Sequence, residues 1–480
     1  MNLLVFASLS FAGKCVLCGP ALLFGRVLYN GERPPPYGRT TVTLDTLARS
    51  GASKRDGRFA LTAVPPGDRA LLVNSRYGPP FYMPDLRLRP GEKRGLLLNL
   101  APIYYSRYGP ASYAGGDFEQ SFCARGNHLL KAAYVGAGSR ETRRGPFDRV
   151  SIRYGRPGGP QIGPVRRVEG RSDIVMTLSA WCAGEVPLFP GERYFLSIDT
   201  PEGAGVYYQK FDALPGESLW QGGKPFPGDL RGLICADPPD LLTVYQVKGT
   251  PVVGETRKSW AQTFTAWGEC IVGAEFMASS GDCPDLRYQL EIHAGGPCGR
   301  RIGPPKIIAA QNSKVTTVVW RRGEMPVEPG ATYCLVICKP AGQPFWLWRS
   351  PWTAYQKGRL YFLEDGLWRC IEGSLRGAVY AFGRLPDISF TSKKIERTES
   401  GVHLSWETDV PAMARVKYGR GKKLNHVAFV DISLKKKRAV TLRLRPESKH
   451  WSFRVEAHAF YHSLSSWEVN RFQVFKKPAR

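Results

Sequence analysis

The sequence predicts an all-β protein built from several β-sandwich modules in tandem. Gly and Pro account for 52 and 38 of the 480 residues, and they separate short apolar segments in the way that turns separate strands. Apolar residues at helical spacing, in runs long enough for a buried helix, are hard to find after residue 25. A chain of 480 residues also exceeds what one hydrophobic core organises, so about three or four modules are expected.

Residues 1–22 form a candidate signal segment. Leu3–Ala12 is a short apolar run that ends in the small-residue stretch Ser10–Ala12. We therefore expect a secreted or cell-surface protein, with an ordinary N-terminal strand or a wrongly assigned start as the alternative. No other run approaches the roughly 18 apolar residues of a membrane span.

The first module is expected at residues 23–100, where short alternating segments are divided by turn residues. Its segments Gly25–Val27, Thr40–Leu44, Asp56–Leu61 and Val64–Gly67 resemble the carboxypeptidase regulatory-like family, which has a transthyretin-like sandwich fold. The resemblance implies no peptidase activity, because that module is an accessory to many unrelated proteins.

Residues 117–237 and 258–383 are predicted to be two copies of one module, because sequence blocks recur in the same order. The matching blocks are Phe118–Phe122 with Trp260–Phe264, Gly163–Pro164 with Gly303–Pro304, Trp181–Pro187 with Trp320–Pro326, Pro190–Tyr194 with Pro329–Tyr333, Trp220–Gly223 with Tyr355–Gly358, and Leu230–Gly232 with Leu375–Gly377. The length and turns of each copy favour a jelly-roll-like sandwich. In texture the pair resembles the carbohydrate-binding-module-like sandwiches of exported bacterial proteins.

The last module is expected at residues 384–480. Val402–Thr408 looks like a strand B with its buried Trp, Ala414–Gly419 looks like strand C, and Trp451–Val455 looks like the approach to strand F. On these segments the module resembles fibronectin type III, which implies another β-sandwich.

The chain is strongly basic, with a formal charge of +26, and 384–480 alone holds 21 Lys and Arg against 9 Asp and Glu. Such a field favours anionic partners, or it serves only as a solvated surface. The run Lys435, Lys436, Lys437 and Arg438 is a candidate anion contact, suited to an acidic envelope polymer. The alternative is a solvated loop or a guard of a sheet edge. Specific nucleic-acid reading is not expected, because no recognition helix is evident.

No catalytic residue, metal site or cofactor is predicted. Only seven His occur, and hydrolase or phosphate-loop motifs are missing from the sequence. The cysteines also differ between the copies, since Cys123 matches Thr265 and Cys182 matches Arg321. A shared catalytic site would survive duplication, so we interpret these cysteines as structural.

Six of the eleven cysteines crowd residues 270–370, and in an exported protein we expect several of them to lie within disulfide reach. Cys334 and Cys338 cannot pair with each other, because a strand holds residues at that spacing roughly 13 Å apart.

Aromatic residues give the candidate ligand site. Trp346 and Trp348 must face the same side of any strand they share. With Trp352 and Tyr355 they form either a sandwich core or a platform on which sugar rings stack, and Tyr207, Tyr208 and Trp220 are the corresponding residues of the first copy.

These observations predict a non-catalytic, secreted or surface-displayed binding or adhesion protein whose partner is a polysaccharide or another envelope polymer. The alternative is a structural spacer or a subunit of an extracellular assembly, with protein partners or self-assembly. An accessory part of an enzyme is a third hypothesis.

Overall fold

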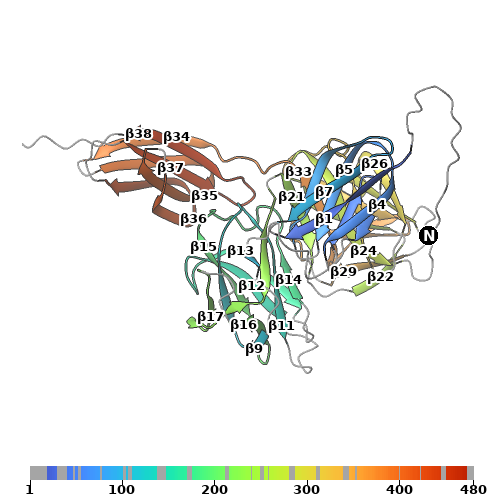
Figure 1. Cartoon of the computed structure of the whole chain (residues 1–480), viewed down its shortest axis with the longest axis horizontal. Helices are drawn as coiled ribbons and strands as arrows, with labels where there is room; N and C mark the ends of the chain where they lie inside the picture. The colour runs from blue at the N-terminus through green and yellow to red at the C-terminus, as the bar shows by residue number, and fades with distance from the viewer. Residues whose placement is uncertain are drawn as a thin grey trace, which may run out of the picture.

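The computed structural model describes residues 19–472, apart from short internal stretches. These stretches are 30–39, 47–48, 52–55, 76–77, 101–103, 106–110, 138–146, 170–175, 211–215, 239, 249–252, 258, 280–286, 310–313, 339–344, 352–353, 399–400, 422 and 445–449. The described part is made of strands and turns, as Figure 1 shows, and it contains no helix long and apolar enough to cross a membrane. The predicted all-β, tandem-sandwich fold is thereby confirmed. The candidate signal segment falls almost entirely outside the described residues.

The first module is a sandwich of two small sheets. One sheet has the order β4 (Arg58–Val64), β1 (Ala21–Tyr29) and β7 (Lys93–Leu100), and β1 runs parallel to β7. The other has the order β3 (Arg49–Gly51), β2 (Thr40–Leu44), β5 (Gly67–Ser75) and β6 (Phe81–Leu88). The alternating apolar residues of β1, β2, β4, β5, β6 and β7 meet in one core. The resemblance to the carboxypeptidase regulatory-like family stays a prediction.

The two repeats each contain a six-stranded sheet, and the strand order is the same in both. In the first repeat it is β13 (Gln161–Glu169), β12 (Phe147–Tyr154), β15 (Arg193–Asp199), β10 (Phe118–Cys123), β17 (Leu219–Gln221) and β18 (Lys224–Phe226). In the second it is β26 (Arg301–Ala309), β25 (Arg287–Ala294), β28 (Thr332–Cys338), β23 (Ser259–Thr265), β30 (Leu360–Glu364) and β31 (Leu367–Ile371).

A seven-stranded sheet completes each repeat. In the first, β19 (Asp229–Leu230), β16 (Gly205–Gln209), β11 (Leu129–Ala137), β20 (Gly232–Ala236) and β8 (Tyr104–Tyr105) lie in order, while β14 (Met176–Ala180) pairs with β11 and β9 (Ala111–Gly115) pairs with β16. In the second, the order is β21 (Leu241–Val247), β33 (Gly377–Phe382), β24 (Cys270–Ser279), β29 (Phe345–Ser350) and β22 (Val253–Arg257), while β27 (Lys314–Val319) pairs with β24 and β32 (Ser374–Leu375) pairs with β29. Each sandwich thus includes two strands that precede the expected starts at 117 and 258.

A buried tryptophan makes the same contact in both repeats. The indole N–H of Trp181 donates to the Pro164 carbonyl over 3.0 Å, and that of Trp320 donates to the Pro304 carbonyl over 3.2 Å. Both side chains are fully buried. Because a buried indole N–H needs an acceptor, the Gly-Pro and Trp blocks of the sequence recur together.

A buried glutamine is duplicated as well. The Gln120 side-chain oxygen accepts from the Leu230 amide at 2.7 Å, and the Gln262 oxygen accepts from the Leu375 amide at 3.0 Å. This contact holds the end of one sheet against the other in each sandwich.

The strand register corrects one of the sequence blocks. Gln120 lies opposite Leu219, and Gln262 lies opposite Leu360. Trp220 therefore corresponds to Tyr361, six residues after the Tyr355 that the sequence alignment paired with it. The block contains too few identical residues to fix the alignment of the two repeats.

The last module is a five-stranded sheet in which β34 (Phe390–Thr398), β35 (Gly401–Arg420), β37 (Trp451–His458) and β38 (Ser465–Phe472) lie in order and β36 (His426–Arg443) pairs with β35. β34 pairs with the first half of β35 and β37 with the second half, and the pairing of β35 with β36 shifts register between Glu407 and Ala414, so the sheet folds over on itself around one core. Val402, Leu404 and Trp406 face the core from the first half of β35. The strand arrangement is that of fibronectin-like and immunoglobulin-like sandwiches.

The first module packs on the outer face of the second repeat. Leu72 and Tyr82 share an apolar cluster with Val272 and Tyr380. The Tyr82 hydroxyl donates to the Trp320 carbonyl at 3.0 Å. Figure 1 places the first module and the second repeat together at one end of the molecule, with the last module at the other end.

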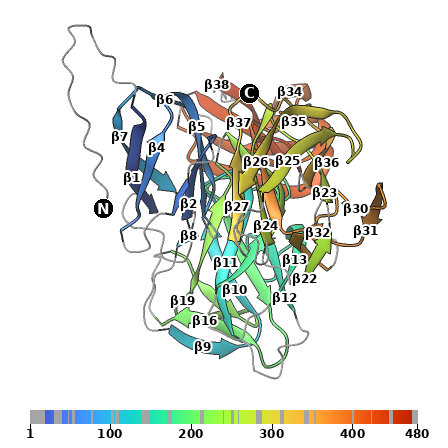
Figure 2. The ribbon, with the colours of Figure 1, turned by 90° about the vertical axis from the view of Figure 1, so that its right-hand side faces the viewer.

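The last module packs on the first repeat through a buried polar contact. Arg415 is 1% exposed, and its guanidinium donates to Glu456 within the module. It also donates to two groups of the first repeat, the Glu192 carboxylate at 3.1 Å and the Pro190 carbonyl at 2.9 Å. Met413 belongs to the core cluster of the repeat. Strands β9, β16 and β19 of the first repeat lie at the end that faces away from both neighbours (Figure 2).

Candidate binding surface

Trp346 and Trp348 lie on the outer face of the seven-stranded sheet of the second repeat. Both belong to β29, where Phe345 and Leu347 alternate with them and fill the core. Trp346 is 48% exposed and Trp348 is partly buried. Of the two interpretations from sequence, the core interpretation is wrong for Trp346, because the register of β29 points the smaller apolar side chains inward.

Gly254 of the neighbouring strand supports the two indoles. It lies opposite Trp348 in the ladder, and a Cβ at this position would stand 3.1 Å from the Trp346 ring and 3.3 Å from the Trp348 ring. Any larger residue would push the indoles away. The glycine therefore lets both rings lie close to the backbone of β22 as one aromatic patch.

The first repeat has aromatic residues at the matching place. Gly136 of β11 pairs with Val206, and the corresponding residue of the second repeat, Ala278 of β24, pairs with Leu347. Val206 therefore corresponds to Leu347, and the next residue, Tyr207, corresponds to Trp348. Tyr207 lies opposite Tyr113 of β9, with the ring centroids 6.0 Å apart in an edge-to-face arrangement.

Tyr113 is 48% exposed and completes this second patch. The sequence analysis missed it because it lies in the Tyr-rich stretch between the expected first module, 23–100, and the expected first repeat, 117–237. Its alternation with Ala114 and Ser112 before a Gly pair was the available signal for a strand.

Tyr208, the neighbour of Tyr207, faces the other way. Its ring packs edge-to-face on Phe226 at 4.8 Å and contributes to the core of the repeat. A strand directs successive side chains to opposite faces, so Tyr208 cannot share a platform with Tyr207.

Tyr355 is also incorrectly assigned to the ligand site. It is 3% exposed, its hydroxyl accepts from the Thr265 amide at 3.1 Å, and its ring packs edge-to-face on Tyr245 at 4.9 Å. These contacts make it a core residue. Trp220 is partly exposed, but it lies on the six-stranded sheet and donates to Ser218 Oγ at 3.0 Å, away from the patch. Trp352 lies outside the described residues.

The basic run of the last module divides into exposed and buried residues. Lys435, Lys436 and Lys437 are exposed, and the first and third pair with Asp431 at 3.5 Å and Glu407 at 3.4 Å. Their assignment as anion contacts stays a prediction.

Arg438 is 8% exposed and its side chain is used within the module. It donates to the Lys435 carbonyl at 2.7 Å and lies 3.4 Å from Asp431. The strand register accounts for the burial of Arg438. It lies opposite Trp406 in the ladder, and Trp406 belongs to the face of the sheet that packs in the core. The prediction of Arg438 as an anion contact is wrong.

The expected disulfides are not found among the described cysteines, all eight of which have free thiols. Cys270 packs against the first module, whereas Cys334 packs on the outer face of the other sheet beside Val336. These two faces lie on opposite sides of the sandwich. Cys270 and Cys334 are therefore far apart, although both belong to the stretch of sequence that is rich in cysteine. Burial raises the pKa of Cys235 to about 12 and that of Cys338 to about 11, so both are poorly reactive at neutral pH.

Within the described residues, no group of three or more His, Cys, Asp or Glu side chains gathers in a way that could hold a metal ion. A close histidine pair, His128 and His458, joins the first repeat to the last module. Its contacts, including a bond from His458 Nδ1 to the Leu188 carbonyl at 3.1 Å, are those of a buried interface.

No family model matches this chain. No curated protein matches it either. Among solved structures, a crystal structure of the FN1–FN3 domains of chicken CNTN1 aligns over 76% of this chain and 100% of that chain, with 12% sequence identity and a TM-score of 0.19. The fold assignment therefore stands on the strands and registers described above.

Proposed function

We propose that this protein is a non-catalytic binding protein, secreted or displayed at the cell surface, that holds a polysaccharide or another envelope polymer on its aromatic patches. The observation that carries the proposal is an aromatic pair on the outer face of the seven-stranded sheet in both repeats, with Trp348 and Tyr207 at corresponding positions. The patches are Trp346 with Trp348, and Tyr113 with Tyr207. Flat rings of this kind bind the apolar faces of sugars, and their hydroxyl and indole groups orient the ligand.

The direct test is retention of the full chain on insoluble polysaccharides, with the double variant Trp346→Ala, Trp348→Ala. We expect the variant to lose retention while its melting temperature falls by only several degrees, because Trp346 is 48% exposed and Trp348 is only partly buried. Leu367→Ala is the matched control, since Leu367 is a large apolar residue that is 62% exposed on the other sheet.

Undiminished retention in the double variant would contradict the proposal. So would unfolding of that variant at the assay temperature, since it would show that the indoles serve the fold.

A structural spacer is the second candidate function, and one observation favours it. Buried polar side chains cross the module boundaries, as Arg415 does toward Glu192 and as Lys131 does toward the Ser75 and Gly78 carbonyls of the first module. Such contacts fix the relative placement of modules. If wild-type protein retains no polysaccharide but self-associates in sedimentation experiments, and the patch variant does not, the spacer is the better account.

The location is a separate part of the proposal. It is supported by the apolar segment Leu3–Ala12 alone, because the free thiols of the described cysteines are more common in reducing compartments. Alkylation of native protein isolated from its source, counted by mass spectrometry, tests it. Fractionation of the chain with the cytosol would contradict it.

A further inference from the structure

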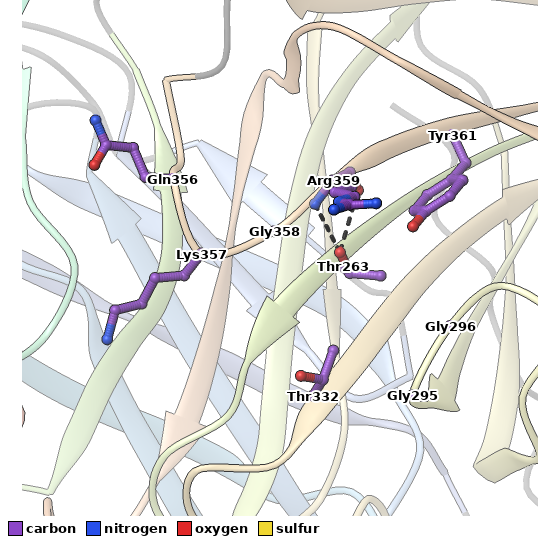
Figure 3. Close-up of a pocket in the computed structure, with 9 residues that line it drawn as sticks. All are labelled: Thr263, Gly295, Gly296, Thr332, Gln356, Lys357, Gly358, Arg359 and Tyr361. Carbon is purple, nitrogen blue, oxygen red and sulfur yellow. Dashed lines mark hydrogen bonds between the residues drawn. The ribbon is translucent and has the colours of Figure 1, made fainter.

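A second candidate binding site lies on the opposite side of the second repeat, on the outer face of its six-stranded sheet. It is an open cavity of about 410 Å³. Its lining is Thr263, Gly295, Gly296, Thr332, Gln356, Lys357, Gly358, Arg359 and Tyr361, drawn in Figure 3. This lining contains two cationic side chains, several hydroxyl and amide groups, one aromatic ring and no carboxylate.

The first repeat provides an internal comparison for this cavity. The Arg359 amide donates to Thr263 Oγ1 at 2.7 Å, just as the Ser218 amide donates to Ser121 Oγ at 2.7 Å. The backbone therefore follows the same course in both copies. Ser218 stands where Arg359 does, and Glu217 stands where Gly358 does.

In the first repeat, a carboxylate of the chain itself fills the matching place. Glu217 accepts from the Ser121 hydroxyl at 2.7 Å and from the Cys123 amide at 2.8 Å. The geometry of this fold thus accommodates a carboxylate at this edge of the six-stranded sheet.

In the second repeat that carboxylate is missing. Gly358 replaces it, and a Cβ there would lie 1.9 Å from the Thr263 carbonyl oxygen, so no side chain fits. The amide of Thr265, which matches that of Cys123, donates to the Tyr355 hydroxyl instead.

The second repeat also has a cationic side chain, Arg359, where the first repeat has Ser218. Arg359 is exposed and, among the described residues, no acidic side chain forms an ion pair with it. In Figure 3 its guanidinium lies toward Tyr361, whereas Lys357 points away from it. Lys357 Nζ lies 3.0 Å from the ring centroid of Tyr461 in the last module, so it is committed to that contact.

We propose that this cavity binds the carboxylate of an acidic sugar, with Arg359 as the main ligand-binding residue and with Thr332 and Tyr361 contacting the sugar hydroxyls. A planar guanidinium forms two parallel hydrogen bonds to a carboxylate, which a lysine cannot do. The ring of Tyr361 and the polar lining suit a single sugar residue, and a cavity of this size accommodates one. The inference rests on the proposed function for the polymer class, and it names uronate-bearing polymers as the preferred ones.

The test is calorimetric titration of the full chain with trigalacturonate, and with its methyl ester as the ligand that lacks the charge. We expect Arg359→Ser, which introduces the residue of the first repeat, to weaken trigalacturonate binding about tenfold or more, as the loss of a charge-assisted hydrogen bond predicts. Arg359→Lys should restore only part of the affinity. Arg369→Ser is the control, since Arg369 is an exposed cation on the same sheet that pairs with Glu364 at 3.2 Å.

Unchanged affinity in Arg359→Ser would overturn the inference, and so would equal binding of the methyl ester. Equal or tighter binding of tri-glutamate would overturn the assignment to a sugar. A variant of the aromatic patch, Trp346→Ala with Trp348→Ala, separates the two proposals: it should lose retention on neutral polysaccharide and keep its affinity for trigalacturonate.

Discussion

Acid should weaken this protein through the buried histidine pair that joins the first repeat to the last module. His458 Nε2 lies 2.9 Å from His128 Nε2, and the two residues are 0% and 6% exposed. Burial lowers the pKa of His128 to about 4 and that of His458 well below its ordinary value, and the neighbouring Arg415 adds to the second shift. Both rings are therefore neutral in the folded protein.

The size of the effect follows from the difference between folded and unfolded pKa values. A free histidine has a pKa of about 6.5, so the unfolded chain binds protons first and stability falls as the pH drops below that value. With a folded pKa of about 4, His128 alone costs about 2 kcal/mol between pH 7.5 and pH 5. The pKa of His458 is lowered in the same direction by burial, so its protonation also disfavours the folded state in acid.

The assay must separate this loss from groups that respond in the opposite sense. Burial raises the pKa of Asp148 to about 6, so the folded protein gains stability from that residue as the pH falls. Urea unfolding at pH 7.5 and pH 5 should therefore compare wild type with the double variant His128→Asn, His458→Asn. An Asn at 458 can still donate to the Leu188 carbonyl.

We expect wild type to lose at least about 2 kcal/mol more than the double variant over this range, which is the contribution of His128. Equal losses in the two proteins would refute the reasoning, because the histidines would then titrate alike in the folded and unfolded chains.

Three further outcomes are expected. Arg415→Ala should lower the free energy of unfolding by about 3–5 kcal/mol in urea titration, because it leaves buried Glu456 without its partner, and a loss under 1 kcal/mol would contradict this. Trp181→Phe and Trp320→Phe should each cost about 2 kcal/mol, since each loses a hydrogen bond and some packing, and clearly unequal costs would argue against equivalent roles. Burial lowers the pKa of Lys131 to about 7, so wild type should gain about 2 kcal/mol over Lys131→Met between pH 7 and pH 9, whereas parallel pH profiles would contradict the burial argument.

The repeat could be recognised from sequence because its blocks carry obligatory local contacts. Trp181 and Trp320 each need a carbonyl acceptor, and a Gly-Pro turn supplies it in both copies, so the residues are retained together. The block around Trp220 holds no such contact. Its alignment to Tyr355 was wrong by six residues, and only the ladder opposite Leu219 and Leu360 placed it correctly.

Burial at module boundaries could not be predicted in this way. His458 and Lys131 lie on strands whose local pattern gives no sign of a covering neighbour, and both are fully buried because another module packs on them. Arg438 sits in a run of cations typical of a solvated loop, yet strand parity directs it to the side of Trp406. Side-chain alternation predicts which residues share a face, but which face is covered depends on contacts between distant segments.

The exposure of Trp346 was equally open from sequence. Alternating aromatics fill many sandwich cores, and the choice depended on whether Trp346 or Phe345 faced inward. A shift of one residue would have reversed the answer. The contact between Tyr113 and Tyr207 depends on the pairing of β9 with β16, which the sequence pattern does not predict.

The most direct measurement of the central claim is polysaccharide retention with each patch removed singly and then with both removed together. One variant carries Trp346→Ala and Trp348→Ala, another carries Tyr113→Ala and Tyr207→Ala, and a third carries all four changes. If both patches hold the same polymer, loss of either should weaken retention strongly and loss of both should abolish it, because two linked sites bind a polymer far more tightly than one. If the fourfold variant stays folded and is retained as well as wild type, the patches do not bind the polymer and the account is wrong.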